Sequence, residues 1–293
     1  MNPHVKSIIS TVAFYDAVGK VPLTKVELYK YLIYQNEASH ISFGDFIELL
    51  DREWETLKPT ISHCRGFYYL LANKNGYARR VETGKTGVQK WRIARRMIRL
   101  ISFLPYVKMV AITGSLALHT THEESDVDVL IVASHGHIWT TRLLVSLLTH
   151  VLGKRRYGER IKDRICLNHY ISDKETVLRP DNIFSRHICS TCVPVWRQKS
   201  YIPPFLQRVA THYCTVGDRI GPLYSVRHFF EWVLAKTVAC ALERTLENFQ
   251  IRKMKGRQFI ADSNALVFHH PRPANQEAMV LYEQYIKALG LSP

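Results

Sequence analysis

The feature that most constrains this chain is an apolar segment that carries two carboxylates, in the run TGSLALHTTHEESDVDVLIV at residues 113–132. Its apolar end predicts a buried strand over residues 126–134. Side chains on a strand alternate between its two faces, so Asp126 and Asp128 point the same way. Two like charges on one face repel each other unless a cation lies between them. The strand therefore predicts a basic side chain or a metal ion beside Asp126 and Asp128.

The surrounding residues predict that this strand belongs to a sheet with helices around it. The segments 107–113 and 164–172 have the apolar pattern of strands, and Gly114–Ser115 makes a turn after the first of them. Helices are predicted for 85–104, which is basic and amphipathic, and for 137–153. This pattern favours an α+β fold with a mixed sheet.

The N-terminal part predicts three helices and a hairpin, at 1–19, 22–35, 42–57 and 60–82. Thr24 is the expected N-cap of the second helix, and Glu27 completes a capping-box pattern. Three helices followed by a hairpin describe a winged helix, which binds DNA in some proteins and packs against protein in others. Both readings stay open.

Beyond residue 181 the chain is predicted to be mostly helical. The expected features are a long helix at 226–255, a polar turn at 262–276 that contains His269 and His270, and a last helix at 277–289. Six cysteines are scattered along the chain, and only one CxxC pair, Cys189 and Cys192, occurs. Without a second pair we expect reduced thiols and no zinc site.

The charge balance indicates a polyanionic partner. The chain has 40 Lys and Arg against 25 Asp and Glu, a net charge of +15. The basic residues cluster at 78–100 and 153–164, which favours nucleic acid or nucleotide phosphate. We find no run of 18 apolar residues and no signal peptide, so we expect a cytoplasmic protein without a membrane partner. The oligomeric state stays open.

One arrangement resembles a known motif. A strand, the Gly114–Ser115 turn, a ten-residue spacer and the Asp126-x-Asp128 strand resemble the nucleotidyltransferase motif of the DNA polymerase beta-like superfamily. The stretches TGSLAL, HIWTTRLL and KDRICLNHY also resemble bacterial proteins that carry this domain after a winged-helix-like region. The resemblance implies three domains, namely a winged-helix-like domain at 1–84, a nucleotidyltransferase core at 85–180 and a C-terminal helical domain at 181–293.

The resemblance also implies a reaction. A nucleoside monophosphate passes from an NTP to an acceptor hydroxyl, and pyrophosphate is released. Asp126 and Asp128 would share Mg²⁺, or Mn²⁺ in its place. Gly114 would let the backbone approach a phosphate, and the Ser115 hydroxyl would hold the β- and γ-phosphates. The basic composition favours a nucleic-acid acceptor such as tRNA or another RNA end.

The superfamily's third carboxylate has no obvious counterpart. The centre of the 164–172 strand is Asn168, which can ligate a metal but cannot act as a base. We expect Asn168 at this position, with Asp163 as the alternative; otherwise two carboxylates suffice or activity is lost. His169 is expected on the opposite face of the strand. Asn168 favours a second class of function, a degenerate nucleotide sensor that binds DNA. A toxin–antitoxin component is a third alternative.

Three further groups of basic residues are candidates for binding. Arg142, one turn into the 137–153 helix, could reach a phosphate or a base, or remain a surface residue. Lys162, Arg164 and the cluster 154–156 could line a groove for nucleotide or acceptor. Each of these assignments depends on where the fold places the side chain.

Overall fold

The computed structural model divides the chain into two compact units. The residues it describes are 1–34, 40–178, 180–198, 201–204, 231, 239–254, 259–261, 265–268 and 273–291. One unit combines Met1–Lys85 with Arg272–Pro293, and the other is Thr86–Pro271. The second unit is therefore inserted between two parts of the first.

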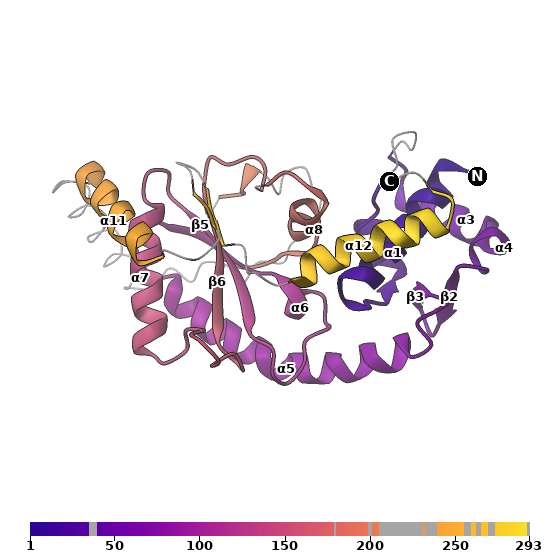
Figure 1. Cartoon of the computed structure of the whole chain (residues 1–293), viewed down its shortest axis with the longest axis horizontal. Helices are drawn as coiled ribbons and strands as arrows, with labels where there is room; N and C mark the ends of the chain where they lie inside the picture. The colour runs from indigo at the N-terminus through magenta and orange to yellow at the C-terminus, as the bar shows by residue number, and fades with distance from the viewer. Residues whose placement is uncertain are drawn as a thin grey trace. The chain divides into compact units, whose positions relative to one another are not determined.

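The first unit contains short helices, a small sheet and a helix from the far end of the chain (Figure 1). Its elements are α1 (Pro3–Gly19), β1 (Leu23–Thr24), α2 (Lys25–Lys30), α3 (Phe43–Arg52), α4 (Trp54–Leu57), β2 (Ile61–Cys64), β3 (Phe67–Leu70), the start of α5 (Gly76–Ile101) and α12 (Pro273–Ala288). The sheet is antiparallel in the order β1-β3-β2. The predicted capping box is confirmed, because the Thr24 hydroxyl accepts from Glu27 N and the Glu27 carboxylate accepts from Thr24 N.

Helix α12 packs against α1. The rings of Phe14 and Tyr282 meet edge to face with centroids 5.5 Å apart. The Tyr285 hydroxyl donates to Asp16 Oδ2 at 3.1 Å and accepts from Lys20 Nζ at 3.0 Å. We expected this helix within a C-terminal domain spanning 181–293, and the structure instead places it with the N-terminal elements.

The second unit is built on a mixed sheet. Besides the rest of α5, its elements are β4 (Val107–Ile112), α6 (Gly114–Ala117), β5 (Val127–Ala133), α7 (Ile138–Val151), β6 (Ile165–Ser172), α8 (Ile183–Thr191), β7 (Val193–Arg197), α11 (Ala239–Lys253), β8 (Phe259–Ala261) and β9 (Ala265–Phe268). Among the described residues the strand order is β7-β4-β5-β6-β9-β8. β5 and β6 are parallel, and the other neighbours are antiparallel. This confirms the predicted α+β fold with a mixed sheet.

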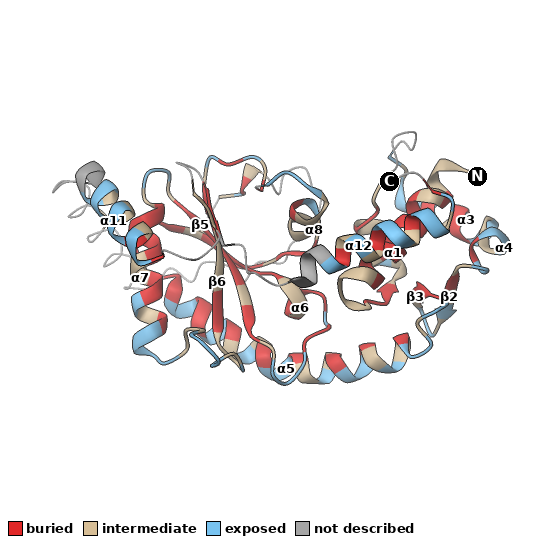
Figure 2. Ribbon diagram, viewed as in Figure 1, coloured by how far each residue is buried: buried red, intermediate tan, exposed pale blue. Residues whose placement is uncertain are grey.

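The central strands are buried on both faces, as the red strands of Figure 2 show. Along β5, Val127, Val129 and Ile131 pack with α5 and α7 on one face. Leu130 and Val132 pack on the other face, against residues of α8 and β9. By the alternation of the strand, Asp126 and Asp128 lie on this second face, the α8 face.

The structure corrects several predicted elements. β7, β8 and β9 are strands in a region that we expected to be helical or a turn, so that expectation is wrong for them. β9 is four residues long, and its pairing with β6 decides its conformation, which a local pattern cannot reveal. Helix α5 begins at Gly76, so the hairpin is shorter than predicted. Most of 226–238, together with His269 and His270, lies outside the described residues.

A search of the described helices for a membrane-spanning segment found none with sufficient length and apolar character.

Candidate active site

Asp126 and Asp128 lie where β5 begins, and a buried lysine on α5 fixes this point. The Lys90 ammonium, 2% exposed, donates to the carbonyls of Glu123 and Ser125, both at 2.7 Å. It also pairs with Asp163 Oδ1 at 2.8 Å, just before β6 begins. A buried ammonium needs such partners to offset its lost hydration. Lys90 thus ties together the segments that lead into β5 and β6.

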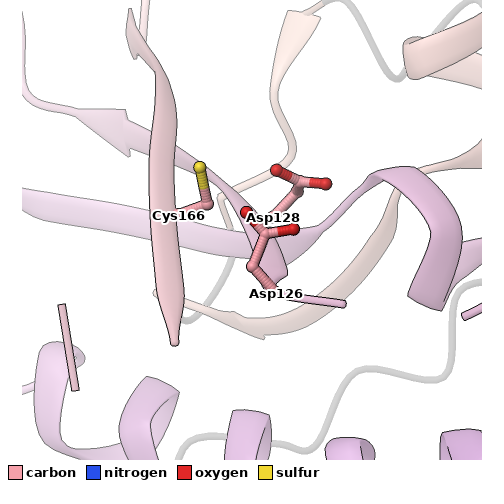
Figure 3. A group of neighbouring side chains, drawn as sticks. All are labelled: Asp126, Asp128 and Cys166. Atoms are coloured by element: carbon pink, nitrogen blue, oxygen red, sulfur yellow. The ribbon is translucent and has the colours of Figure 1, made fainter. Parts of the chain in front are cut away.

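Three donor groups converge on the α8 face of the sheet. One carboxylate oxygen each from Asp126 and Asp128 and the sulfur of Cys166 lie within 4.8 Å of one another. Figure 3 shows the three side chains pointing to the same side of their two strands. The parallel pairing of β5 and β6 places Cys166 opposite Asp128, which explains why the thiol joins the carboxylates.

Asn168 also reaches this group. Its Nδ2 donates to Asp128 Oδ1 at 2.7 Å, and its Oδ1 accepts from the Cys166 thiol at 3.0 Å. Alternation along β6 puts Asn168 on the same face as Cys166. After Leu167 the strand is irregular, because the register jumps from Val129–Leu167 to Leu130–His169. The jump puts His169 opposite Leu130, on the α8 face. The expectation that His169 lies on the opposite face is therefore wrong, because simple alternation does not survive a bulge.

Gly114 brings the backbone close to Asp128. Its φ is +65°, a left-handed conformation that glycine adopts without steric cost. A Cβ placed there would lie 3.2 Å from Cγ of Asp128 and nearer still to Oδ2. The neighbouring Thr113 N donates to Asp128 O at 3.0 Å, which holds the two segments together. The turn and the carboxylate thus form one tight unit.

An arginine balances part of the negative charge. The Arg156 guanidinium forms an ion pair with Asp126 Oδ2 and lies 3.5 Å from Cys166 Sγ. Burial lowers the pKa of Arg156, but the charge of Asp126, followed by the interaction with Cys166, raises it by more, so the net shift is upward. Arg156 therefore supplies part of the positive charge that was predicted beside the two carboxylates.

The Cys166 thiol is neutral in this setting. Burial, followed by the negative charges of Asp128 and Asp126, raises its pKa well above the usual value. Only 3% of the residue is exposed. The protein by itself thus holds a protonated sulfur between two carboxylates and a guanidinium.

The other predicted binding residues are distributed differently. Ser115 is partly exposed at the start of α6. It directly follows Gly114, the residue whose backbone lies against Asp128. Lys162 is exposed and pairs with Glu123 and Glu124, whose carboxylates raise its pKa despite the opposing effect of desolvation. Asp163, the alternative third acid, pairs with Lys90.

Arg142 lies away from the carboxylates. It is buried on α7, on the sheet face opposite to that of Asp128, and donates to Oε1 of Gln250 on α11 and to Sδ of Met254, the residue after α11. Gln250 in turn donates to Trp139 O at 2.9 Å. The structure therefore does not bring Arg142 to the group, and its contacts join α7 to α11.

Sequence reasoning missed Cys166 as a member of the site. The available signal was its position two residues before Asn168 on one strand, which places both side chains on one face. Arg156 was included only as part of a basic cluster, because nothing in the sequence links it to Asp126. Lys90 carried no signal beyond being one of many basic residues on its helix.

The donor set fits a divalent metal ion. Two carboxylates and a thiol within reach of one ion are ligands that divalent metals accept, and Gly114 keeps the side next to Asp128 clear of a side chain. The ion pair with Arg156 engages Oδ2 of Asp126. A metal therefore either uses the other oxygen of Asp126 or requires Arg156 to move.

Comparison with known proteins identifies the domain. Residues 94–179 match the family described as nucleotidyltransferase domain. This stretch runs from α5 through β6 and includes Gly114, Asp126, Asp128 and Cys166. Comparisons with curated proteins and with solved structures gave no match. Residues 94–179 of this chain therefore form a nucleotidyltransferase domain of the DNA polymerase beta-like type.

Proposed function

We propose that the protein transfers a nucleoside monophosphate from a metal-bound NTP to an acceptor hydroxyl and releases pyrophosphate. The observation that carries the proposal is the convergence of Asp126 and Asp128 beside the tight Gly114 turn, within the matched domain. Two carboxylates on one strand face are the oxygen donors that Mg²⁺ and Mn²⁺ prefer. The reaction needs in-line placement of the acceptor and charge stabilisation more than covalent chemistry from the protein.

Each residue has a distinct task in this proposal. Asp126 and Asp128 would hold the divalent ions, whose positive charge would stabilise the phosphates and make the acceptor hydroxyl easier to deprotonate. Gly114 admits a phosphate close to the backbone, and Ser115 donates its hydroxyl to a phosphate oxygen. Asn168 orients Asp128 through its hydrogen bond and takes no proton.

A nucleic-acid acceptor is supported by the exposed face of α5. Four arginines occupy one stripe of this helix at i, i+3, i+4 and i+7, namely Arg92, Arg95, Arg96 and Arg99, and all are exposed. Within the described part of the chain, no carboxylate pairs with them. Like charges three and four residues apart destabilise a helix slightly, so a stripe of this kind suits a polyanion. Lys90 on the same helix contacts the residue before Asp126, whereas the stripe lies on the opposite, exposed side of the helix.

The first test measures transfer directly. Purified protein is incubated with each α-labelled NTP and a pool of short RNAs that includes tRNA, in separate reactions with Mg²⁺, Mn²⁺ or Co²⁺. Labelled RNA and pyrophosphate are then quantified. We expect both products, and their loss in Asp126→Asn/Asp128→Asn. Glu159→Gln, which removes an exposed negative charge, is the matched control and should remain active. Absence of both products with every nucleotide would overturn the transferase proposal.

The second test addresses the acceptor. Arg92→Gln/Arg96→Gln should weaken RNA binding and reduce the slope of log K against log salt by about 1.5, since each phosphate contact contributes about 0.7 to 0.9. The control Arg52→Gln/Lys58→Gln removes two exposed basic charges from the first unit. An unchanged slope in the α5 variant would exclude the stripe as the acceptor surface.

A nucleotide-sensing regulator is the second candidate. Asn168 at the predicted position of the third acid and Arg156 paired with Asp126 favour binding without turnover. The order α1, β1, α2, α3, α4, β2, β3, with a β1-β3-β2 sheet, supports reading the first unit as a winged helix that contacts DNA. Metal-dependent NTP binding that changes DNA affinity, with no labelled product, would select this function.

A further inference from the structure

The most unusual member of the candidate site is the sulfur of Cys166. It stands opposite Asp128 in the β5–β6 pairing, within 4.8 Å of an oxygen of each carboxylate. The side chain is buried, and the amide of Asn168 fixes it by accepting from the thiol while donating to Asp128. The sulfur is therefore held by a hydrogen bond beside the two carboxylates.

When a divalent ion is present, the charges around the sulfur are compatible with a thiolate. Asp126 and Asp128 contribute two negative charges, and the Arg156 guanidinium contributes one positive charge. With a neutral thiol the group carries a net charge of −1, and with a thiolate it carries −2. A divalent cation balances the second arrangement, and a coordinating thiol gives up its proton.

Donor chemistry then decides which ion the site prefers. Mg²⁺ is a hard ion that takes oxygen ligands and gains little from sulfur, whereas a thiolate draws softer ions such as Zn²⁺, Co²⁺ and Cd²⁺. We propose that Cys166 ligates the metal as a thiolate and makes the site selective for a thiophilic divalent ion over Mg²⁺. On binding, the metal–sulfur bond replaces the S–H bond, and the proton passes to solvent. The inference rests on the proposed function, which requires a metal at Asp126 and Asp128.

The experiment uses Co²⁺ and Cd²⁺ as spectroscopic probes on the full chain. Thiolate ligation gives a sulfur-to-metal charge-transfer band in the ultraviolet, which carboxylate ligation does not. We expect this band on titration of the protein, its loss in Cys166→Ser, and its retention in Cys189→Ser/Cys192→Ser, which removes the CxxC pair. Cys166→Ser should weaken Cd²⁺ binding by about tenfold or more while Mg²⁺ binding changes little.

A second variant tests the role of Cys166 independently of any folding defect in Cys166→Ser. Cys166→Asp supplies a third carboxylate, so we expect preference to shift toward Mg²⁺, measured as the rise in melting temperature that each ion produces. Circular dichroism establishes whether both variants fold.

The outcomes separate this inference from the proposed function. If Mn²⁺ and Mg²⁺ bind and Asp126→Asn/Asp128→Asn abolishes binding, but no sulfur band forms at Cys166, only the role of Cys166 is refuted. If no divalent ion binds at all, the proposed function fails as well. A band that survives in Cys166→Ser and disappears in Cys189→Ser/Cys192→Ser would assign the thiophilic ion to the CxxC pair and overturn the inference.

Discussion

At Gly114 the main chain and a carboxylate approach so closely that no side chain fits between them. We expect Gly114→Ala to reduce stability by about 1–2 kcal/mol, because alanine is strained at a left-handed φ and its Cβ would press on Asp128. The same contact displaces the carboxylate, so the free energy of divalent-ion binding should weaken by more than the free energy of unfolding. Urea unfolding and Mn²⁺ titration measure the two effects. The control is Gly84→Ala, where an added Cβ meets no atom within 4 Å.

Arg156 supplies positive charge to Asp126, the same carboxylate that a divalent ion would engage. We expect Arg156→Gln to lower the stability of the metal-free protein by about 3 kcal/mol, because it leaves a buried carboxylate without its ion pair. Divalent ions should then stabilise the variant more than the wild type, since they replace the lost positive charge. Thermal melts with and without Mn²⁺ give the comparison. Equal shifts in the two proteins would show that Arg156 and the ion do not compete.

Residues differ in how far the sequence could predict their roles. Asp126 and Asp128 were predictable, because alternation along one strand is a local property. The contributions of Cys166 and Asn168 depend on which strand lies beside β5, and the face of His169 depends on the bulge after Leu167; neither feature is local. Arg142 shows the reverse, since a basic residue near the motif became a buried link between α7 and α11.

Among the elements, α8 contributes a pH-sensitive group to the second unit. Burial lowers the pKa of His187 to about 4, below its ordinary value of about 6.5. The unfolded chain therefore binds more protons than the folded protein between these values, so stability should be lost as the pH falls from about 6.5 to about 4. We expect His187→Gln to lose less stability over this pH range, as measured by urea unfolding. His122→Gln, at an exposed position, should behave like the wild type.

Elements with strong local signals were predicted well, and those defined by pairing were not. The capping box of α2 and the apolar strands β4, β5 and β6 carry their own signals. β8 and β9 are three and four residues long and exist because they extend the sheet beside β6. A short run of apolar residues between polar ones cannot reveal such a partner.

At the scale of the whole molecule, the first unit depends on a helix that follows the second unit in sequence. Ile286 on α12 is 1% exposed, so we expect Ile286→Ala to destabilise the first unit by about 2–4 kcal/mol through a buried cavity. Hydrogen exchange should rise in α1 but not in β5, and metal binding should persist. Val280→Ala, 52% exposed on the same helix, is the control and should change neither. Equal acceleration in α1 and β5 would contradict the division into two units.

The pairing of α1 with α12 also has a consequence during biosynthesis. A ribosome releases α1 long before it has translated α12, and the complete nucleotidyltransferase domain emerges in between. The nascent N-terminal segments must wait, with part of their apolar surface uncovered, until the last helix leaves the exit tunnel. The second unit is complete in sequence before then, so we expect the order of maturation to run from the middle of the polypeptide outward.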